Sequence, residues 1–284
     1  MFIDAETVFL GLFGNPVEHS LSPLMHNMTL QKMGINCIYL PFKINPGDLG
    51  DAVKALKKLN IRGVNVTIPF KEEVIKYLDV ISDEVRTCGA VNLIKNENGQ
   101  LVGYNTDGRG FIGALEEANV EIKGRVLLIG AGGAARSIAY ELAYRGVEHI
   151  DFLDINYETA LNLADFIAAA AAISTNAWFM NEEEFILLSR NANIIINCSP
   201  VGMYPDVEQS PVSSLETLDE TVICDVIYNP LKTRFLLMGE EKGLKTINGL
   251  SMLVYQGALT LQILLGIEPP VDYMKEVVCH KLQK

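Results

Sequence analysis

The residues with the clearest chemical purpose are six small ones, Gly130-Ala131-Gly132-Gly133-Ala134-Ala135, which follow an apolar run and precede a helical stretch. The first glycine permits a tight turn, and Gly132 lets the backbone approach a pyrophosphate at the amino terminus of the helix. Residues 130–134 are therefore candidate dinucleotide contacts. The alternative is a glycine-rich turn that binds nothing.

An acidic residue, Asp154, lies 24 residues after Gly130, at the end of the next predicted strand. A carboxylate at this position accepts hydrogen bonds from the ribose hydroxyls of NAD, whereas an NADP site usually offers an arginine to the 2′-phosphate. No cation occurs among residues 155–157. The sequence thus predicts NAD as the cofactor, with NADP less favoured. The alternative role for Asp154 is a helix cap.

Two short polar segments in the first third of the chain could bind and transform a small anion. Ser20 and Ser22 stand just before a predicted helix, where hydroxyls and free N–H groups suit a carboxylate. Lys71 follows Asn65-Val-Thr-Ile-Pro69 and is expected in the first turn of a proline-started helix, whose dipole would lower its pKa and suit it to proton transfer. Taken singly, Ser22 could be a helix cap and Lys71 a solvated surface lysine.

Together these segments resemble the shikimate dehydrogenase family over nearly the whole chain. Seven motifs occur in the family's order: Gly14-x-Pro-x-x-His-Ser-x-Ser-Pro-x-x-His-Asn27, Asn65-Val-Thr-x-Pro-x-Lys71, Gly89-Ala-Val-Asn92, Gly103-Tyr-Asn-Thr-Asp-Gly108, Asn197-Cys-Ser-Pro-Val-Gly-Met203, Asp225-Val-Ile-Tyr-Asn-Pro230 and Gln256-Gly-Ala258. One motif departs from the family: its NADP-dependent members carry Asn-Arg-Thr or Asn-Arg-Ser where this chain has Asp154-Ile-Asn156.

The resemblance implies a role for each matching residue. Lys71 and Asp107 would be the catalytic pair, and Ser20 and Ser22 would hold the substrate carboxylate. From the residues alone, Asp107 could equally be a cap on the helix that follows it. The remaining substrate contacts would be Thr67, Asn92, Tyr228 and Gln256, and the nicotinamide end of the cofactor would be lined by Met203, Val226 and Gly249.

The elements that must position these residues are short apolar runs alternating with longer amphipathic stretches, the pattern of an α/β protein with parallel sheets. Before residue 108 the predicted strands carry polar residues such as Asn65, Thr67 and Asn92; after it comes the wholly apolar strand that ends at Gly130. We therefore expect a substrate-binding domain of residues 1–107 plus 250–284 and a Rossmann-type, doubly wound dinucleotide domain of residues 108–249. That the last helices return to the first domain is implied by the resemblance.

Composition narrows the partners. The formal net charge of -12 opposes binding to nucleic acid or to an anionic membrane surface. The amino terminus lacks the pattern of a signal peptide, and the five scattered cysteines favour a reduced, cytoplasmic protein. The four histidines show no metal-ligand spacing, so no metal is expected. The expected partner is a small molecule, and the chain would be a monomer or homodimer.

Three functions remain open at this point. The first is NAD-preferring reduction of 3-dehydroshikimate to shikimate. The second is a dehydrogenase acting on quinate as its main or second substrate, which differs from shikimate by a ring hydroxyl and a double bond. The third is a non-catalytic sensor of such ligands, which the presence of both Lys71 and Asp107 disfavours.

Overall fold

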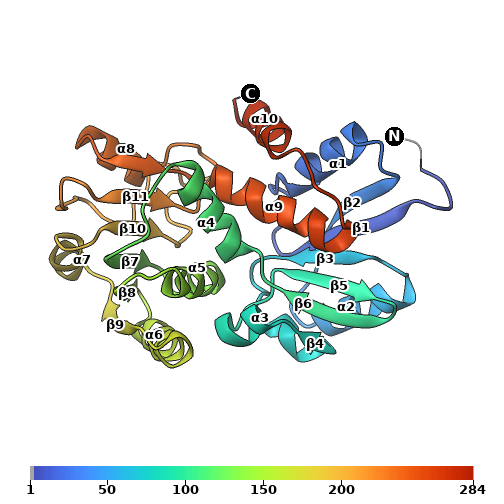
Figure 1. Ribbon diagram of the computed structural model, residues 1–284, viewed down its shortest axis with the longest axis horizontal. Coiled ribbons are helices and arrows are strands. Elements are labelled where there is room, and N and C mark those ends of the chain that lie inside the picture. The colour runs from blue at the N-terminus through green and yellow to red at the C-terminus, as the bar shows by residue number, and fades with distance from the viewer. Residues whose placement is uncertain (1–2, 284) are drawn as a thin grey trace. The chain divides into compact units, whose positions relative to one another are not determined.

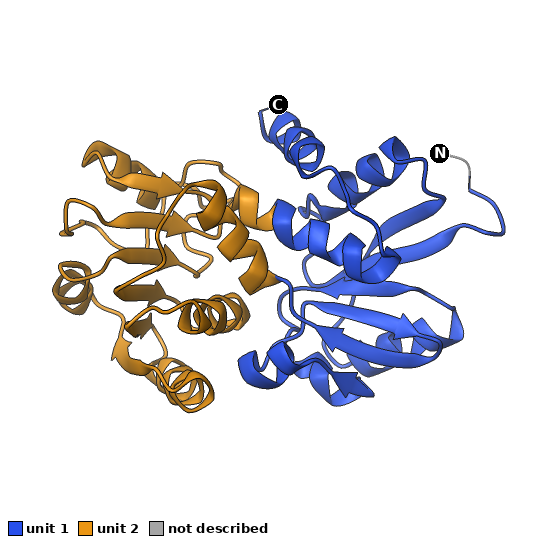
Figure 2. Cartoon of the chain, in the orientation of Figure 1, with its two compact units in different colours: residues 1–106, 254–284 blue, residues 107–253 orange. Residues whose placement is uncertain are grey.

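The alternation of apolar runs and amphipathic stretches produces two six-stranded sheets in the computed structural model, which describes residues 3–283. The chain divides into two units, one made of residues up to 106 together with residues from 254 onward, and the other of residues 107–253 (Figures 1 and 2). The expected fold class, a two-domain α/β protein with a Rossmann-type second domain, is confirmed.

The first unit has a mixed sheet with the order β2-β1-β3-β5-β6-β4. Strand β1 pairs in parallel with β2 and β3, whereas β5 runs antiparallel to β3 and β6. Its elements are β1 (Val8–Gly14), α1 (Ser22–Lys32), β2 (Cys37–Lys43), α2 (Leu49–Lys58), β3 (Gly63–Val66), a 3₁₀ helix (Glu73–Tyr77), β4 (Val80–Ile81), α3 (Asp83–Cys88), β5 (Leu93–Glu97), β6 (Gln100–Tyr104) and α10 (Val271–Leu282).

The second unit has a fully parallel sheet with the order β12-β11-β10-β7-β8-β9. The reversal of strand order beside β7 is that of a doubly wound dinucleotide fold, in which ligands bind outside the carboxyl ends of the strands. Its elements are α4 (Asp107–Glu117), β7 (Arg125–Ile129), α5 (Gly133–Tyr144), β8 (His149–Asp154), α6 (Tyr157–Ala171), β9 (Ser174–Phe179), α7 (Glu182–Ser189), β10 (Ile194–Asn197), β11 (Val222–Asp225), α8 (Arg234–Glu241) and β12 (Lys245–Ile247). Helix α9 (Gly249–Leu265) begins in this unit and continues into the first.

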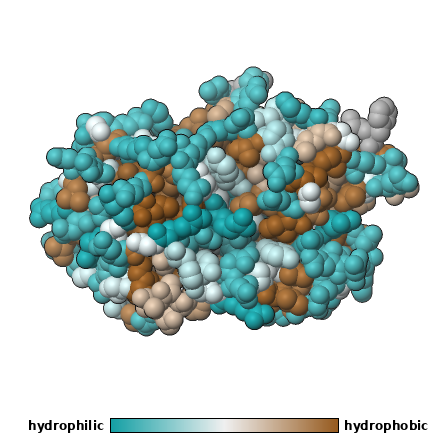
Figure 3. All heavy atoms as spheres, viewed as in Figure 1, coloured by the Kyte–Doolittle hydropathy of each residue, from teal (hydrophilic) through white to brown (hydrophobic). Residues whose placement is uncertain are grey.

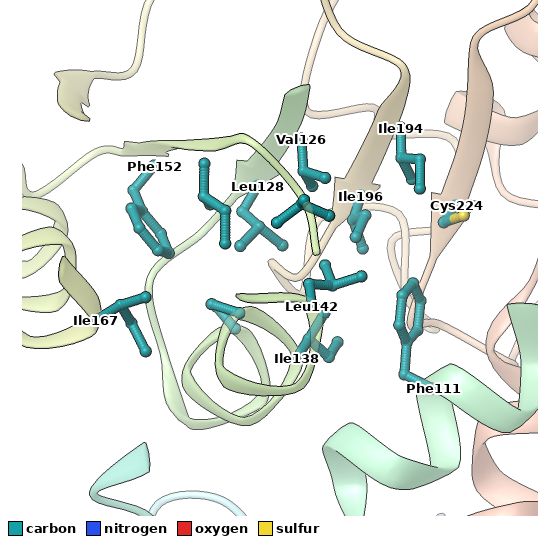
Figure 4. Packing of buried hydrophobic residues seen from close by; sticks show 14 of the residues in the cluster. Phe111, Val126, Leu128, Ile138, Leu142, Phe152, Ile167, Ile194, Ile196 and Cys224 are labelled. Atoms are coloured by element: carbon teal, nitrogen blue, oxygen red, sulfur yellow. The ribbon is translucent and has the colours of Figure 1, made fainter. Parts of the chain in front are cut away.

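The second unit has one apolar layer on each face of its sheet. Successive side chains of a strand point to opposite faces, so alternate residues of each strand enter different layers. Val126, Leu128 and Phe152 pack with α4, α5 and α6 (Figure 4). Leu127 and Leu153, their neighbours in sequence, pack with α7 and α8. Both faces of this sheet are therefore buried, which explains why its strands are almost wholly apolar.

Two helix starts differ from expectation. Asparagine followed by proline favours the start of a helix, so the sequence predicts one from Asn229-Pro230 to Gly243. Asn229-Pro230 does not open a helix; α8 begins at Arg234, where the Thr233 hydroxyl caps it by accepting from the Leu236 N–H at 3.3 Å. Pro69 likewise opens no α-helix, and only the short 3₁₀ helix follows it. In both places proline permits a helix start, but the chain starts its helix elsewhere.

The view in Figure 3 shows hydrophilic residues interspersed with separate hydrophobic patches. Scattered exposed apolar side chains are usual on protein surfaces. No helix within residues 3–283 is long and apolar enough to span a membrane.

Two phenylalanines on neighbouring strands test the packing of the second unit. Phe152 on β8 is fully buried, so Phe152→Ala should lower the free energy of unfolding by about 3–5 kcal/mol. Phe179 on β9 is 53% exposed, and Phe179→Ala should change it by less than about 1 kcal/mol. Urea unfolding can be followed by the fluorescence of Trp178, the single tryptophan, which belongs to the same unit. Equal losses in the two variants would contradict the packing described.

Candidate functional site

The glycine turn after β7 combines one glycine that the fold requires with another that it does not. Gly130 has φ +93°, and a Cβ there would lie 3.1 Å from the backbone nitrogen of Ser199. Gly132 has an ordinary φ of -82°, and a Cβ would meet nothing within 4 Å in the described chain. Neither the backbone conformation nor the packing requires glycine at position 132. Close approach of the protein backbone to a ligand phosphate explains this glycine best. The turn fits a dinucleotide.

Both carboxylate oxygens of Asp154 accept hydrogen bonds from backbone N–H groups. Oδ2 accepts from the N–H of Ala131 at 2.7 Å, and Oδ1 accepts from the N–H of Asn156 at 2.8 Å. The cap of α6 is Asn156, whose side chain accepts from the Thr159 N–H, so Asp154 is not the cap. The carboxylate instead ties the glycine turn to the start of α6.

A buried amide–carboxylate pair organises the loops beyond β10 and β11. Asn197 donates from Nδ2 to both oxygens of Asp225 at 3.2 Å, and Asp225 also accepts from the Thr233 hydroxyl at 2.7 Å and the Ile227 N–H at 3.0 Å. Asn197 Oδ1 accepts from the Ser199 N–H at 3.0 Å. Burial raises the pKa of Asp225 from 3.8 to about 6, against the opposing effect of these hydrogen bonds.

This pair holds in place the loops that carry the predicted nicotinamide contacts. Val226 follows Asp225 directly, and its carbonyl oxygen would lie 2.0 Å from a Cβ on Gly249. Those two residues are therefore in contact, and glycine is required at 249 for that reason. Met203 is 43% exposed on the neighbouring loop, which is tied to Asn229 by the Tyr204 N–H at 3.0 Å. Tyr228 lies between Val226 and that anchor and is half-buried.

In the first unit three predicted residues lie on adjoining segments. The Val91 N–H donates to the carbonyl of Lys71 at 2.8 Å, and the Val66 N–H donates to the carbonyl of Asn92 at 2.8 Å. Thr67 follows Val66 at the end of β3. Backbone hydrogen bonds beyond the end of β3 thus join the segments that carry Thr67, Lys71 and Asn92.

The local structure around Lys71 differs from the expected proline-started helix, and its catalytic role stays a prediction. Lys71 precedes the 3₁₀ helix that starts at Glu73 and does not lie in the first turn of an α-helix. The proposed dipole effect on this lysine therefore has no structural basis.

The two serines also differ in detail from expectation. Ser22 is the first residue of α1, follows the N-cap residue Leu21 and makes no capping bond. Its N–H donates to the Ser20 hydroxyl at 3.3 Å, so that N–H is not free for a ligand. Gln256 lies on α9, where a Cβ on the next residue, Gly257, would be 2.4 Å from the Met25 side chain. Helices α1 and α9 are therefore closely packed behind the serines.

Asp107 is buried and opens α4 in the second unit. Helix α4 packs tightly on α5, because a Cβ on Gly108 would lie 2.2 Å from the carbonyl oxygen of Ser137. Lys71 belongs to the first unit and Asp107 to the second. Their pairing remains a prediction.

Sequence reasoning missed the residues that hold the site residues in place. Asn197 and Asp225 were recognised only as parts of motifs, and Asn65 only as a polar residue in a strand. The usable signal was a polar side chain at a strand position where apolar residues would be expected, since a buried polar group needs partners. No group of three or more His, Cys, Asp or Glu residues in the described range could hold a metal ion.

Comparison with known proteins yields matches along the whole chain. The description "Shikimate dehydrogenase substrate binding domain" fits residues 12–94, and "Shikimate 5'-dehydrogenase C-terminal domain" fits residues 249–279. The chain is 56% identical to shikimate dehydrogenase (NADP(+)) from Syntrophomonas wolfei, covering 100% of this chain and 98% of that protein.

Solved structures agree at the level of fold. A shikimate dehydrogenase crystallised with NADP+ superposes with a TM-score of 0.92 at 40% identity, covering 100% of this chain and 98% of the other. Quinate dehydrogenase from Corynebacterium glutamicum in complex with NAD gives a TM-score of 0.87 at 27% identity, covering 96% and 99%.

The prediction that NAD is the preferred cofactor is contradicted by these relatives. The Syntrophomonas enzyme is named for NADP(+), as are further relatives at 42% and 43% identity. The preference for NAD was inferred from the place of Asp154 in the sequence, and a contact of this residue with the ribose stays a prediction. In the structure both carboxylate oxygens already bind backbone N–H groups.

The carboxylate pocket can be tested at the two serines. Replacing Ser20 and Ser22 by alanine should raise KM for shikimate, with a loss of at most about 1.5–3 kcal/mol for each charge-assisted hydrogen bond. Dinucleotide affinity should stay constant, because the glycine turn belongs to the other unit. An unchanged KM for shikimate in the double variant would show that the carboxylate is held elsewhere.

Asp225 predicts a pH-dependent stability. Its pKa in the folded state, about 6, exceeds its ordinary value of 3.8, so the folded protein binds this proton more tightly than the unfolded chain does. The contribution of Asp225 to the free energy of unfolding is therefore greatest below about pH 4, and it falls as the pH rises to about 6. Between pH 4 and 7 the wild type should lose about 2–3 kcal/mol relative to Asp225→Asn.

Comparing the two proteins removes the contribution of other groups. Burial lowers the pKa of His26 to about 3, so this residue makes stability increase with pH, the opposite of Asp225. The effect is the same in the wild type and in Asp225→Asn. Parallel pH profiles of unfolding free energy for wild type and Asp225→Asn would refute the assignment.

Proposed function

Because the chain belongs to the shikimate dehydrogenase family, we propose that it catalyses the reversible, NADP-linked interconversion of 3-dehydroshikimate and shikimate. The resemblance found in the motifs is confirmed, and the chain is an oxidoreductase of this family. The observation that supports the substrate assignment is that backbone hydrogen bonds join the segments that carry Thr67, Lys71 and Asn92 at the end of β3.

The dinucleotide would supply or accept the hydride, and the glycine turn is the part of this chain suited to hold it. Gly132 leaves open space above the amino terminus of α5, where backbone N–H groups favour a phosphate. The loops tied by Asn197 and Asp225 would line the nicotinamide end through Met203, Val226 and Gly249. Their buried anchor would hold these loops in a defined position.

Lys71 is the group we assign to the proton. Reduction of a ring carbonyl builds negative charge on oxygen, and a positioned ammonium both stabilises that charge and supplies the proton. Asp107 would accept a hydrogen bond from the neighbouring ring hydroxyl and orient Lys71. Ser20 and Ser22 would hold the carboxylate, while Asn92, Tyr228 and Gln256 would contact ring hydroxyls.

Quinate is the alternative substrate, favoured by the structural similarity to quinate dehydrogenase. The test is an initial-rate assay of the purified protein with shikimate or quinate as reductant and NADP or NAD as acceptor. Shikimate oxidation with a kcat/KM at least tenfold above that for quinate is the expected outcome. A higher value for quinate would overturn the substrate assignment, and no turnover of either would leave the sensor as the better account.

The proton donor can be tested at Lys71. Lys71→Ala should lower kcat by about 10²-fold or more, the usual contribution of a general acid–base group, while shikimate affinity changes much less. Lys76→Ala is the matched control, because Lys76 is five residues away in sequence, is exposed and contacts Glu73 and the Tyr77 ring. The assignment fails if kcat of Lys71→Ala stays near that of the control.

A further inference from the structure

Asn65 is a buried amide in β3 whose three hydrogen bonds join three separate segments of the first unit. Its Oδ1 accepts from the Tyr39 hydroxyl at 2.8 Å, and its Nδ2 donates to the Asn92 carbonyl at 3.1 Å and to the Thr260 hydroxyl at 3.0 Å. Those partners lie in β2, in the segment just before β5, and in α9. The amide therefore has a use for each of its polar atoms.

The bonds to Asn92 determine both its backbone and its side chain. Its carbonyl accepts from Asn65 and from the Val66 N–H, at 3.1 and 2.8 Å. Its side-chain oxygen accepts from the Thr106 N–H at 2.8 Å, and its Nδ2 donates to the Thr106 hydroxyl at 2.9 Å. Asn92, 2% exposed, is thus held from two sides.

Tyr39 is in turn held by an aromatic contact. The His26 ring stacks on it with the centroids 4.4 Å apart and the planes at 29°. His26 is fully buried, and neither ring nitrogen has a hydrogen-bond partner in the described chain. A Cβ on Gly257 of α9 would lie 3.3 Å from its Cε1, so the imidazole is confined on that side too. Stacking against the buried His26 ring therefore helps to fix the Tyr39 ring, whose hydroxyl donates to Asn65.

We propose that Asn65 is a positioning residue that fixes Asn92 in its substrate-binding orientation, with Tyr39 and Thr260 holding the Asn65 amide. The inference rests on the proposed function, in which Asn92 contacts a ring hydroxyl. Buried polar networks of this kind specify a single arrangement when every member is satisfied. The polar atoms of the Asn65 side chain are engaged within the protein, so its effect on the substrate would be exerted through the geometry of Asn92.

The experiment is a double-mutant cycle with a matched control. Asn65→Ala, Asn92→Ala and the double variant are compared by KM, kcat and the calorimetric Kd for shikimate. The control is Asn96→Ala, which removes another buried amide on the same sheet, bonded to the carbonyls of Leu56 and Ile61 at 3.1 Å. Asn65→Ala and Asn96→Ala should each lower Tm. The first removes one donor from the Asn92 carbonyl, and the second removes the donor to the carbonyls of Leu56 and Ile61.

Of these two variants, only Asn65→Ala should weaken substrate binding. We expect Asn65→Ala to raise KM and Kd for shikimate about tenfold, and Asn96→Ala to leave both within about twofold. In the cycle the double variant should bind no worse than Asn92→Ala alone, because residues that act through one another are not additive. Additive losses, or equal changes in Asn65→Ala and Asn96→Ala, would overturn the positioning role.

Two milder variants guard against a folding failure of Asn65→Ala. Tyr39→Phe and Thr260→Val each remove one partner of the Asn65 amide while nearly keeping its shape, and each should raise KM about two- to fivefold. Unchanged KM and Kd in both would also overturn the proposal. Because every comparison is a ratio to wild type and includes Kd, absence of wild-type turnover would count against the proposed function alone.

Discussion

Buried side-chain hydrogen bonds at the ends of strands are the constraint on which the candidate site depends. Loops beyond a sheet carry backbone groups that secondary structure does not satisfy, and burying them without partners would be costly. The second unit meets this need with Asn197 and Asp225, and the first with Asn65 and Asn92. In each unit one short amide side chain reaches carbonyls, N–H groups or hydroxyls from several segments. These anchors hold in place the segments that carry the predicted ligand contacts.

The anchors also explain why the strands of the two units differ in composition. Strand β7 is apolar apart from Arg125 because helices cover both faces of its sheet, and its predicted function lies in the turn that follows. Strand β3 instead carries Asn65 within its length, where the amide bonds to β2, α9 and the segment before β5. A polar residue inside a strand thus marks the place where the sheet itself organises a site.

The sequence predicted most of the fold, because apolar periodicity and glycine spacing are local signals. The Gly130 turn, the buried strand before it and the two-domain α/β class all followed from such patterns. The start of α8 did not, since Thr233 acts as its cap while also bonding to Asp225, a partner eight residues away. The cofactor prediction failed for a similar reason. What Asp154 does depends on N–H groups that only the folded turn brings to it.

The path of the chain has a consequence for synthesis on the ribosome. The second unit is one uninterrupted stretch, residues 107–253, whereas the first begins at the amino terminus and is completed only by α9 and α10. Leu261 and Leu264 belong to the same apolar cluster as Leu10 and Leu12. During translation part of the apolar surface of the earliest strands therefore stays uncovered until the residues of α9 have been synthesised. The unit made second can fold first, and the nascent chain would depend on chaperones mainly through its amino-terminal sheet.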